Sequence, residues 1–374
     1  MKNKNISIIG VGRLGLCLAL CLEKSGYHVL GVDISQQYIQ LINNKKLSSC
    51  EPFVEEYLKE SSHFRATASL KEGIEFSDVC LITVPNNTLP HIATYDHEIL
   101  SNILREINQQ KVKNKHLVIS STVFPGYIRN KGLPLIKECS NTSISYKPEF
   151  IAQGNIIQGL RSPDMILIGE GSQEAGNILK EIYMNLCINS PPISRMSIES
   201  AEIAKLAINC FITGKIAFAN LIGDIADESP GAEKNDVLEA IGRDQRIGSK
   251  NLKPGYGFGG PSFHLDNQAL ENYASFLGID AALIKAAENS NLFHSEFMAK
   301  KFMQKNLNEY IFDDVCYKPN CPEPIIEHSP KLAVAEKVAY CGKKVTILDT
   351  ENVIQKVQQQ YGDVFKYVKQ NLSP

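Results

Sequence analysis

Three polar side chains in the stretch GFGGPSFHLD, residues 257–266, could do chemistry. Ser262 carries a hydroxyl, His264 an imidazole and Asp266 a carboxylate, and the glycines let the backbone approach a ligand. A serine hydroxyl is a weak nucleophile unless a neighbouring base takes its proton. If the segment is extended, Ser262 and His264 point to the same side and a Ser–His pair is conceivable. The sequence shows no evident acid to orient His264.

A second candidate pair lies in a long helical segment that starts near Ser197. Lys205 and Asn209 are four residues apart and therefore project from one face of that helix. A lysine and an asparagine on an otherwise apolar face are costly to bury without a purpose. The lysine could stabilise a developing alkoxide, and the asparagine amide could hold the same oxygen or a water. The alternative is a lysine at the helix edge that extends to solvent.

Hydroxyl and carboxylate groups also follow predicted strands. Ser121 and Thr122, in STVFPG, end the strand predicted at 116–121, and ligands bind beyond the carboxyl ends of such strands. Glu149, in KPEF, precedes the expected domain joint. It is a second carboxylate candidate, for which a solvated position in a loop is the alternative.

The motif GVGRLG, residues 10–15, fits the glycine pattern of a dinucleotide-binding loop. It follows a predicted strand and opens a predicted helix, as that function requires. Gly10 would make the tight turn, Gly12 would let a pyrophosphate approach, and Gly15 would let helix and strand pack closely. Asp33 ends the second strand, where a carboxylate binds a ribose diol and repels a 2′-phosphate. The motif therefore predicts NAD rather than NADP as the cofactor.

Residues 244–266, DQRIGSKNLKPGYGFGGPSFHLD, are rich in basic residues and glycines. Backbone amides of glycine-rich loops suit phosphates, and arginine suits a bidentate phosphate contact. Arg246, Lys250 and Lys253 are therefore candidates for binding a phosphorylated ligand.

The elements that must position these residues alternate between strands and helices in the first half of the chain. Hydrophobic patterns predict helices at 14–24 and 98–110, and strands at 5–9, 27–32, 78–84, 116–121 and 143–147. This alternation predicts an α/β fold of the Rossmann type, with a doubly wound parallel sheet covered on both faces.

Helical patterns dominate from Ser197 onward. A continuous pattern covers 197–228 without a proline, and a helix of this length normally spans a domain joint or an oligomer interface. A strand is expected at 343–348, and further helices are expected at 234–241, 265–277, 279–293, 295–306 and 331–340. We expect three domains, at residues 1–196, 197–295 and 296–374.

The composition is that of an ordinary globular chain. Its 374 residues suffice for two or three domains, and a net charge of −2 indicates neither a nucleic-acid nor an acidic-membrane partner. We expect no apolar run long enough for a membrane span, and no signal peptide. The ten cysteines form no CxxC pair and lack the tight Cys/His spacing of a metal site. We therefore expect reduced thiols and a cytoplasmic location.

Taken in order, these motifs resemble those of the UDP-glucose/GDP-mannose dehydrogenase family, from the N-terminus to Pro330. GVGRLGL resembles GxGYVGL, STVFPG resembles STVPPG, and KPEFIAQG resembles NPEFLREG. The long helix is similar to AExxKxxxNxFxAxKIxFxN. Residues 244–266 are similar to DxRIGxxFLxPGxGFGGSCFPKD, and YKPN with the later SP is similar to FKPNTDDxRESP.

The resemblance implies an NAD-dependent nucleotide-sugar dehydrogenase with a Rossmann-type domain, a helical central domain and a truncated C-terminal α/β domain. Such enzymes oxidise the primary alcohol of the sugar to a carboxylate in two steps. By position, Thr122 and Asp266 would hold and activate a water, and Lys205 and Asn209 would stabilise oxyanions. Glu149 would lie beside the reacting carbon.

The resemblance also implies two larger sets of contacts. The cofactor contacts would be Gly10, Gly12, Arg13, Leu14, Gly15, Asp33, Val84, Pro85, Ser121 and Thr122. The substrate contacts would be Phe150, Ile151, Arg246, Lys253, Gly259 and Lys318. Arg246 would reach the neighbouring subunit's nucleotide, across a homodimer built on the helix at 197–228.

The departures from the family pattern bear on the reaction. Ser262 aligns with the family's nucleophilic cysteine, and the third domain is short. Other departures are Gln153 for a glutamate, Asn251 for an aromatic residue, His264 for a proline, Leu265 for a lysine, and a missing arginine in IIEHSP.

The full reaction captures an aldehyde on a thiolate, which a serine does not supply. We therefore expect a two-electron alcohol/carbonyl oxidoreductase. Two alternatives remain. One is direct oxidation of a hydrated aldehyde held by Asp266 and Thr122, and the other is an NAD-binding homologue without turnover that acts as a partner subunit.

Overall fold

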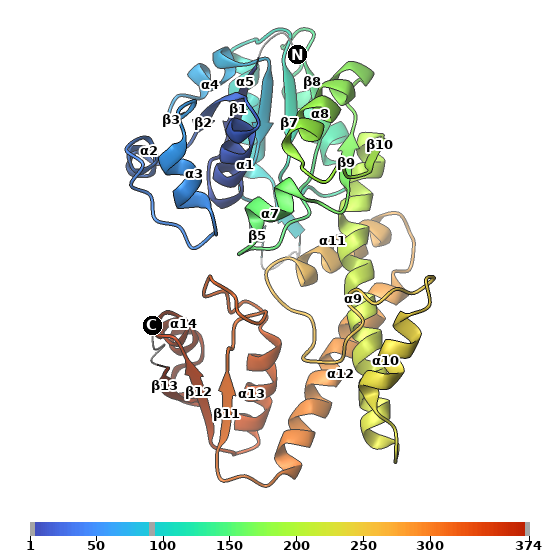
Figure 1. Cartoon of the computed structure of the whole chain (residues 1–374). Coiled ribbons are helices and arrows are strands. Elements are labelled where there is room, and N and C mark those ends of the chain that lie inside the picture. The colour runs from blue at the N-terminus through green and yellow to red at the C-terminus, as the bar shows by residue number, and fades with distance from the viewer. Residues whose placement is uncertain (1–3, 90–93, 371–374) are drawn as a thin grey trace. The chain divides into compact units, whose positions relative to one another are not determined.

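The computed structural model describes residues 4–89 and 94–370. The chain divides into two compact units, Met1–Lys205 and Leu206–Pro374. The first unit is an α/β domain, and the second combines long helices with a small parallel sheet (Figure 1). The expected boundaries after residues 196 and 295 stay predictions.

A mostly parallel sheet forms the centre of the first unit. Its spatial order is β10 (Ile193–Met196), β9 (Ile166–Gly169), β8 (Ser143–Tyr146), β7 (His116–Ile119), β4 (Val79–Ile82), β1 (Asn5–Ile9), β2 (His28–Val32) and β3 (Phe64–Thr67). Only the β8–β9 pair among these neighbours is antiparallel. The chain order reverses at β1, which opens a crevice at the carboxyl ends of β1 and β4. The predicted fold class is confirmed, and the five predicted strands end within two residues of their expected bounds.

Helices cover both faces of this sheet (Figure 1). One apolar cluster joins Ile6 and Ile8 of β1 to α1 (Arg13–Lys24), α2 (Gln36–Asn43), α3 (Val54–Glu60), α7 (Ile156–Arg161) and α8 (Gln173–Leu186). The other joins Ile9 to α4 (Leu70–Phe76), α5 (Glu98–Gln109) and α6 (Leu133–Leu135). Because successive strand residues point to opposite faces, a short apolar strand such as β1 contributes to both clusters. The hairpin β5 (Asn87–Leu89) and β6 (Thr94–Asp96) follows β4.

The long helix is α9, Ile198–Glu228, as expected from its unbroken apolar pattern. It is long and apolar enough to cross a membrane by length and composition alone, with a mean hydropathy of 1.5 over its most apolar window. The expectation that no apolar run reaches that length is therefore wrong. One such helix is weak evidence for a membrane span, because core helices of soluble proteins pass the same test.

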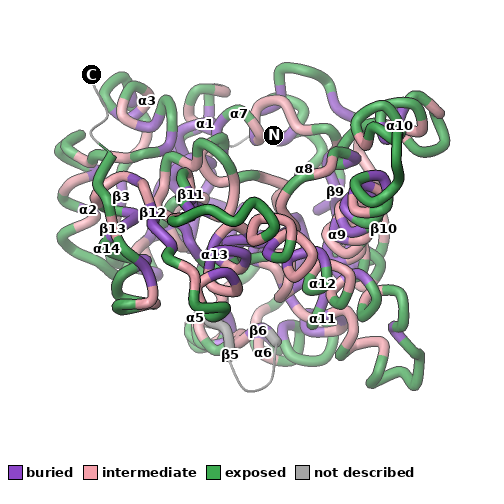
Figure 2. Tube along the Cα trace, turned by 90° about the horizontal axis from the view of Figure 1, so that it is seen from below, coloured by how far each residue is buried: buried purple, intermediate pink, exposed green. Residues whose placement is uncertain are grey.

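The other helices of the second unit are α10 (Lys234–Gly242), α11 (Phe263–Phe276), α12 (Ala282–Gln304), α13 (Pro330–Tyr340) and α14 (Glu351–Tyr361). α10 is exposed along most of its length (Figure 2). The expected helices at 279–293 and 295–306 are one helix, α12. The polar His294 does not interrupt α12, because it is buried and bonds Asp224 of α9.

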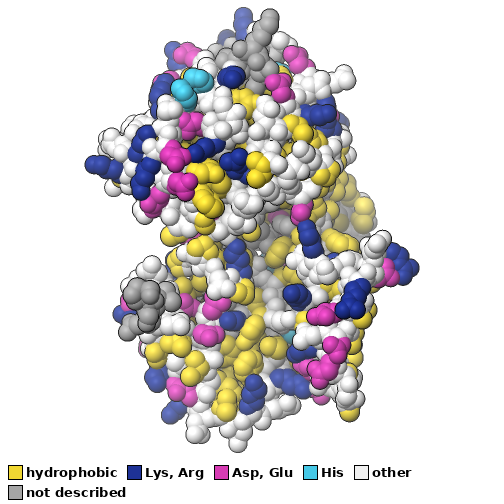
Figure 3. Space-filling model, in the orientation of Figure 1, with side chains coloured by type: hydrophobic (Ala, Val, Ile, Leu, Met, Phe, Trp, Pro, Cys, Tyr) yellow, Lys and Arg dark blue, Asp and Glu magenta, His cyan; other side chains and the backbone are white. Residues whose placement is uncertain are grey.

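A small parallel sheet of β11 (Tyr310–Asp313), β12 (Val345–Asp349) and β13 (Lys366–Lys369) completes the second unit. Its core includes Phe312, Ile347 and Val338 of α13. Apolar side chains reach the surface of both units on the face drawn in Figure 3, and basic and acidic side chains are interspersed there. None of the ten cysteines, all of which lie in the described part of the chain, forms a disulfide.

Candidate active site

The GVGRLG loop joins β1 to α1 and has the shape that a dinucleotide needs. Gly10 has a φ of +92°, in the left-handed region that favours glycine. A side chain at Gly15 would overlap the carbonyl oxygen of Gly10. A methyl group at Gly12 would meet no protein atom within 4 Å, so the space beside its backbone is open. These residues fit NAD, with its pyrophosphate at the N-terminus of α1.

The remaining predicted cofactor residues lie with this loop at the carboxyl edge of the sheet: Asp33 after β2, Val84 and Pro85 after β4, and Ser121 and Thr122 after β7. Ser121 Oγ donates to the Val84 carbonyl oxygen at 2.5 Å. The Asn86 amide donates to the Thr122 carbonyl oxygen. These bonds tie the ends of β4 and β7 together beside the crevice.

Two side chains that sequence analysis missed hold the segment after Thr122. Glu202 of α9 is fully buried, and its carboxylate accepts from the Gly126 and Ile128 N–H groups at 2.6 and 3.0 Å. His97 Nε2 accepts from the Phe124 N–H group at 3.1 Å. Burial lowers the pKa of His97 to about 4, so its ring is neutral at pH 7. Burial raises the pKa of Glu202, although its two backbone hydrogen bonds oppose that shift.

Glu149 is buried within a closed set of contacts, with 7% of its side chain exposed. One carboxylate oxygen pairs with the Lys147 amine at 2.5 Å, and the other accepts from the Tyr183 hydroxyl at 2.8 Å. The Lys147 amine also lies 3.9 Å from the centroid of the Tyr183 ring. Burial lowers the pKa of Lys147 and raises the pKa of Tyr183 well above its ordinary value. The alternative of a solvated loop carboxylate is therefore wrong.

Lys205 lies at the end of the first unit and is 9% exposed. Its amine donates to the Glu149 carbonyl oxygen at 3.1 Å and lies 4.8 Å from the centroid of the Phe150 ring. The alternative of an edge lysine that extends to solvent is wrong. In the segment that follows Phe150, Ile151 packs on the apolar cluster that includes α1. Gln153 accepts a hydrogen bond from Arg13, which lies in the cofactor loop.

In the second unit, the structure brings Asn209 and Asp266 together. The Asn209 side-chain amide, on α9, donates to the Asp266 carboxylate, on α11. Asp266 is 1% exposed. Ser262 immediately precedes α11, and its carbonyl oxygen accepts from the Asp266 N–H group at 2.8 Å. Ser262 therefore lies one helical turn before Asp266.

The Ser262–His264 pair, which an extended segment would have made conceivable, does not form. The segment is not extended, because α11 begins at Phe263, and residues two apart on a helix do not face each other. His264 Nδ1 instead bonds Glu288 of α12 at 2.8 Å. The centroid of the His264 ring lies 5.0 Å from the centroid of the Phe258 ring and 4.6 Å from the centroid of the His328 ring. Glu288 is thus the acid that orients His264, a partner that no local sequence signal indicated.

A neighbouring thiol does not take the place of a nucleophile at residue 262. Cys210, next to Asn209 on α9, lies with its Sγ 3.7 Å from the Asp266 carbonyl oxygen. Burial, followed by the charge of Asp266, raises the pKa of Cys210 to about 12. Such a thiol stays protonated at neutral pH and is a poor nucleophile.

A cavity of about 600 Å³ lies in the second unit; its lining is largely apolar and also includes four lysines and Asp314. Its lysines are Lys250, Lys253, Lys318 and Lys331. Lysines gathered around one cavity favour an anionic ligand such as a diphosphate. Arg246 is not among its lining residues; its side chain is 89% exposed and pairs with Asp244 at 2.7 Å. Gly259 is not among the lining residues either; a side chain there would overlap the His328 carbonyl oxygen.

Comparison with known proteins identifies the first unit and the N-terminal part of the second. The NAD-binding domain of the UDP-glucose/GDP-mannose dehydrogenase family matches residues 4–187, and the central domain of that family matches residues 199–292. The GDP-mannose 6-dehydrogenase of Pseudomonas aeruginosa is 32% identical over 300 residues, which cover 76% of this chain and 68% of that protein. The chain belongs to the UDP-glucose/GDP-mannose dehydrogenase family.

Two further proteins are similar to this chain over most of its length. The UDP-glucose 6-dehydrogenase of Rickettsia prowazekii is 30% identical over 303 residues, covering 79% of this chain and 69% of that protein. The structure of a UDP-glucose dehydrogenase from Pyrobaculum islandicum superposes with a TM-score of 0.87 at 25% identity, covering 98% of this chain and 86% of that one. NAD is therefore the cofactor, as GVGRLG predicted.

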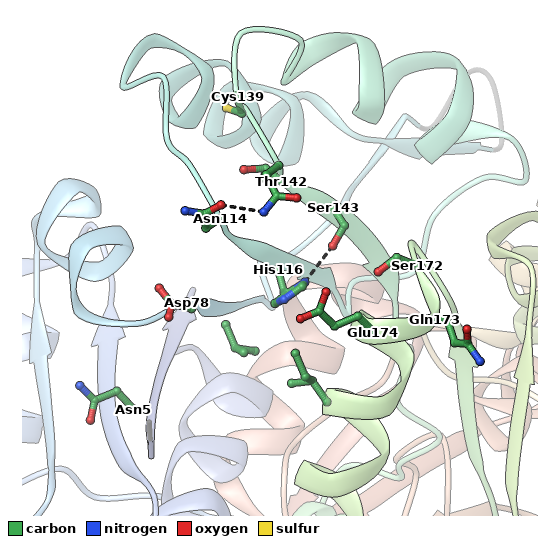
Figure 4. A pocket seen from close by; sticks show the side chains of 13 residues that line it. Asn5, Asp78, Asn114, His116, Cys139, Thr142, Ser143, Ser172, Gln173 and Glu174 are labelled. Atoms are coloured by element: carbon green, nitrogen blue, oxygen red, sulfur yellow. Dashed lines mark hydrogen bonds between the residues drawn. The ribbon is translucent and has the colours of Figure 1, made fainter. Parts of the chain in front are cut away.

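A larger cavity in the first unit lies away from the residues predicted to serve this dehydrogenase. It measures about 800 Å³ and is lined by Asn5, His116, Ser143 and Glu174 among others (Figure 4). His116 and Ser143 bond each other at 3.0 Å. Asn5, His116 and Ser143 begin β1, β7 and β8, so this cavity lies at the amino edge of the sheet. Ligands of doubly wound sheets bind at the carboxyl edge, and the cavity is not the cofactor crevice.

Proposed function

We propose that this protein is an NAD-dependent nucleotide-sugar dehydrogenase limited to two-electron alcohol/carbonyl oxidoreduction. The observation that carries the limit is the environment of Ser262. In the second unit, His264 is engaged by Glu288 and the thiol of Cys210 has a raised pKa, so neither activates a nucleophile at this position. A covalent thioester step, which a cysteine at residue 262 would make available, is absent from the proposed reaction.

The proposed reaction needs only groups for positioning and charge stabilisation. The roles proposed for the Lys205 amine and for the Asn209 amide are to stabilise the negative charge that develops on the carbinol oxygen of the substrate. The role proposed for Asp266 and for Thr122 is to take up the proton of that alcohol through a water, while the carbon–hydrogen bond breaks and the carbonyl forms. The hydride acceptor for this oxidation would be supplied by NAD, held by the loop of residues 10–15. Support comes from the buried Lys205, the Asn209–Asp266 hydrogen bond and the fit of the cofactor loop.

The cavity lined by lysines supports a nucleotide diphosphate as the part of the substrate remote from the reaction. Lys253 and Lys318, both predicted substrate contacts, line it together with Tyr256 and Tyr317. The lysines suit the diphosphate, and the tyrosine rings offer apolar and hydrogen-bonding surface. A panel of UDP and GDP sugars would identify the base and the sugar.

A homodimer through α9 is part of the proposal. Phe211, Phe218, Leu221 and Ile225 are exposed, at 74%, 49%, 47% and 54%. Their spacing of seven, three and four residues places them in one stripe along the helix. A second copy of the chain would cover this stripe, with Arg246 reaching the neighbouring subunit's nucleotide. The cysteines of this protein, none of which forms a disulfide, support a cytoplasmic location.

The test is turnover with NAD and a panel of UDP and GDP sugars, followed by product mass. We expect NADH formation, with one NADH per product molecule and an aldehyde or ketone. An acid with two NADH would replace the proposal by direct oxidation of a hydrated aldehyde. NAD binding without turnover on any sugar would indicate a partner subunit instead.

The variant Ser262→Cys sharpens the same test. If Ser262 occupies the nucleophile's place, the variant should gain acid formation, because a thiolate captures the aldehyde. The matched control is Ser249→Cys, a substitution of the same type at a lining residue of the lysine cavity, where no gain of acid is expected. A well-folded Ser262→Cys enzyme that forms only the wild-type product would count against this assignment of Ser262.

A further inference from the structure

The loop that forms one wall of the lysine cavity has no strand or helix of its own to satisfy its backbone. Gly255, Tyr256 and Gly257 line the cavity, between Lys253 and the start of α11. Backbone groups of such a segment need other partners wherever water is excluded. The partners at Gly255 and Phe258 are side chains of α9 and α12.

Gly255 is held from both sides of its backbone. Its N–H group donates to the Asn220 side-chain oxygen at 2.9 Å, and its carbonyl oxygen lies 2.6 Å from His294 Nε2. The other His294 nitrogen faces both carboxylate oxygens of Asp224, at 2.9 and 2.8 Å. Asn220 and His294 are 1% and 5% exposed. The Asp224 carboxylate therefore orients the ring that bonds the loop.

Phe258 is held in the same way by a single amide. Its N–H group donates to the Asn291 oxygen at 2.8 Å, and its carbonyl oxygen accepts from the Asn291 nitrogen at 3.0 Å. The Asn291 side chain packs directly against Gly257, where any side chain would overlap it. An amide that both accepts and donates in this way replaces the neighbouring strand that the loop lacks.

We infer that Asn220, His294 and Asn291 are positioning residues that hold residues 255–258 in the shape that binds the nucleotide sugar. None of the three lines the cavity, so they act through the loop and not on the ligand. This inference rests on the proposed function, because it takes the lysine cavity as the substrate's binding site. A preorganised wall loses no conformational freedom on binding, which is the benefit that these side chains supply.

The decisive variants are Asn291→Ala and the milder Asn291→Asp, which keeps an acceptor but loses the donor. Asn289→Ala, an exposed asparagine on the same helix, is the matched control. In full-length protein without ligand, we expect faster hydrogen exchange at residues 253–260 in both Asn291 variants. Calorimetric affinity for UDP or GDP, whichever the wild type binds, should fall about tenfold in Asn291→Ala, because a loop without both hydrogen bonds of Asn291 loses conformational freedom when the ligand binds. The KM for the sugar nucleotide should rise similarly while kcat changes less than about twofold.

Three outcomes would count against the inference. Unchanged exchange at 253–260 in both Asn291 variants would show that the amide does not hold the loop. Faster exchange with unchanged nucleotide affinity would show that the loop's shape does not matter for binding. A wild-type protein that binds neither UDP nor GDP would overturn the proposed function and the inference together, whereas wild-type binding with indifferent variants overturns the inference alone.

Discussion

The two glycine-rich loops of this dehydrogenase are held in opposite ways. Loop 10–15 is held mainly by backbone: the Gly10 N–H group donates to the Val32 carbonyl oxygen, and the Leu16 N–H group donates to that of Gly12. One hydroxyl, from Thr83, adds a bond to the Gly10 carbonyl oxygen. At Gly255 and Phe258, by contrast, the partners are side chains of helices.

This difference explains why the shape of the first loop can be predicted from its own residues, whereas the shape of the second cannot. A loop held by its own strand and helix carries its geometry in its own residues, so GVGRLG is recognisable wherever it occurs. A loop held by distant side chains depends on residues such as Asn291, which no pattern within residues 255–260 reveals. Chemistry at the second loop is therefore freer to change, as Ser262 illustrates.

The largest effect is expected at Gly15 of the first loop. In Gly15→Ala, the new methyl group would overlap the Gly10 carbonyl oxygen, and because that atom is backbone it cannot move aside cheaply. We expect a loss of about 3 kcal/mol in the free energy of unfolding, typical of severe overpacking. Thermal and denaturant unfolding would measure it.

Gly12→Ala is the matched control within the same loop. No protein atom lies within 4 Å of the added methyl group, so stability should change little. The affinity for NAD should nevertheless fall, because the methyl group occupies the space where the pyrophosphate approaches. Equal stability losses in the two variants would contradict the distinct roles of Gly12 and Gly15.

The same contrast explains how far the sequence could predict the structure. Strands, the long helix and the cofactor edge followed from apolar periodicity and from glycine spacing, which are local signals. The partners of His264 and Glu149 did not, because Glu288, Lys147 and Tyr183 acquire their roles only through packing. The conceivable Ser262–His264 pair does not form for a local reason, since the helix begins one residue after Ser262.

A smaller effect is expected at Glu202, where a side chain holds backbone in the first unit. Glu202→Ala leaves the Gly126 and Ile128 N–H groups without their acceptor. We expect a loss of about 2 kcal/mol in the free energy of unfolding, because buried donors are costly to leave unpaired. Glu202→Gln, which keeps one acceptor oxygen, should lose less. Stabilities of both variants that match the wild type would show that water satisfies these donors.

The smallest effect concerns His97, which holds the Phe124 N–H group of the same segment. Burial lowers the pKa of His97 to about 4 in the folded protein, whereas an unfolded chain binds a proton near pH ~6.5. The unfolded state therefore takes up the proton first as pH falls, and stability drops between pH ~6.5 and ~4. Between pH 7 and pH 5 the contribution of His97 should be about 1–2 kcal/mol. His97→Gln keeps an acceptor but does not titrate, so its denaturation midpoint should fall less steeply with pH than that of the wild type. Parallel pH profiles for the two proteins would mean that His97 does not contribute to acid sensitivity, and that the segment after Thr122 depends on Glu202 instead.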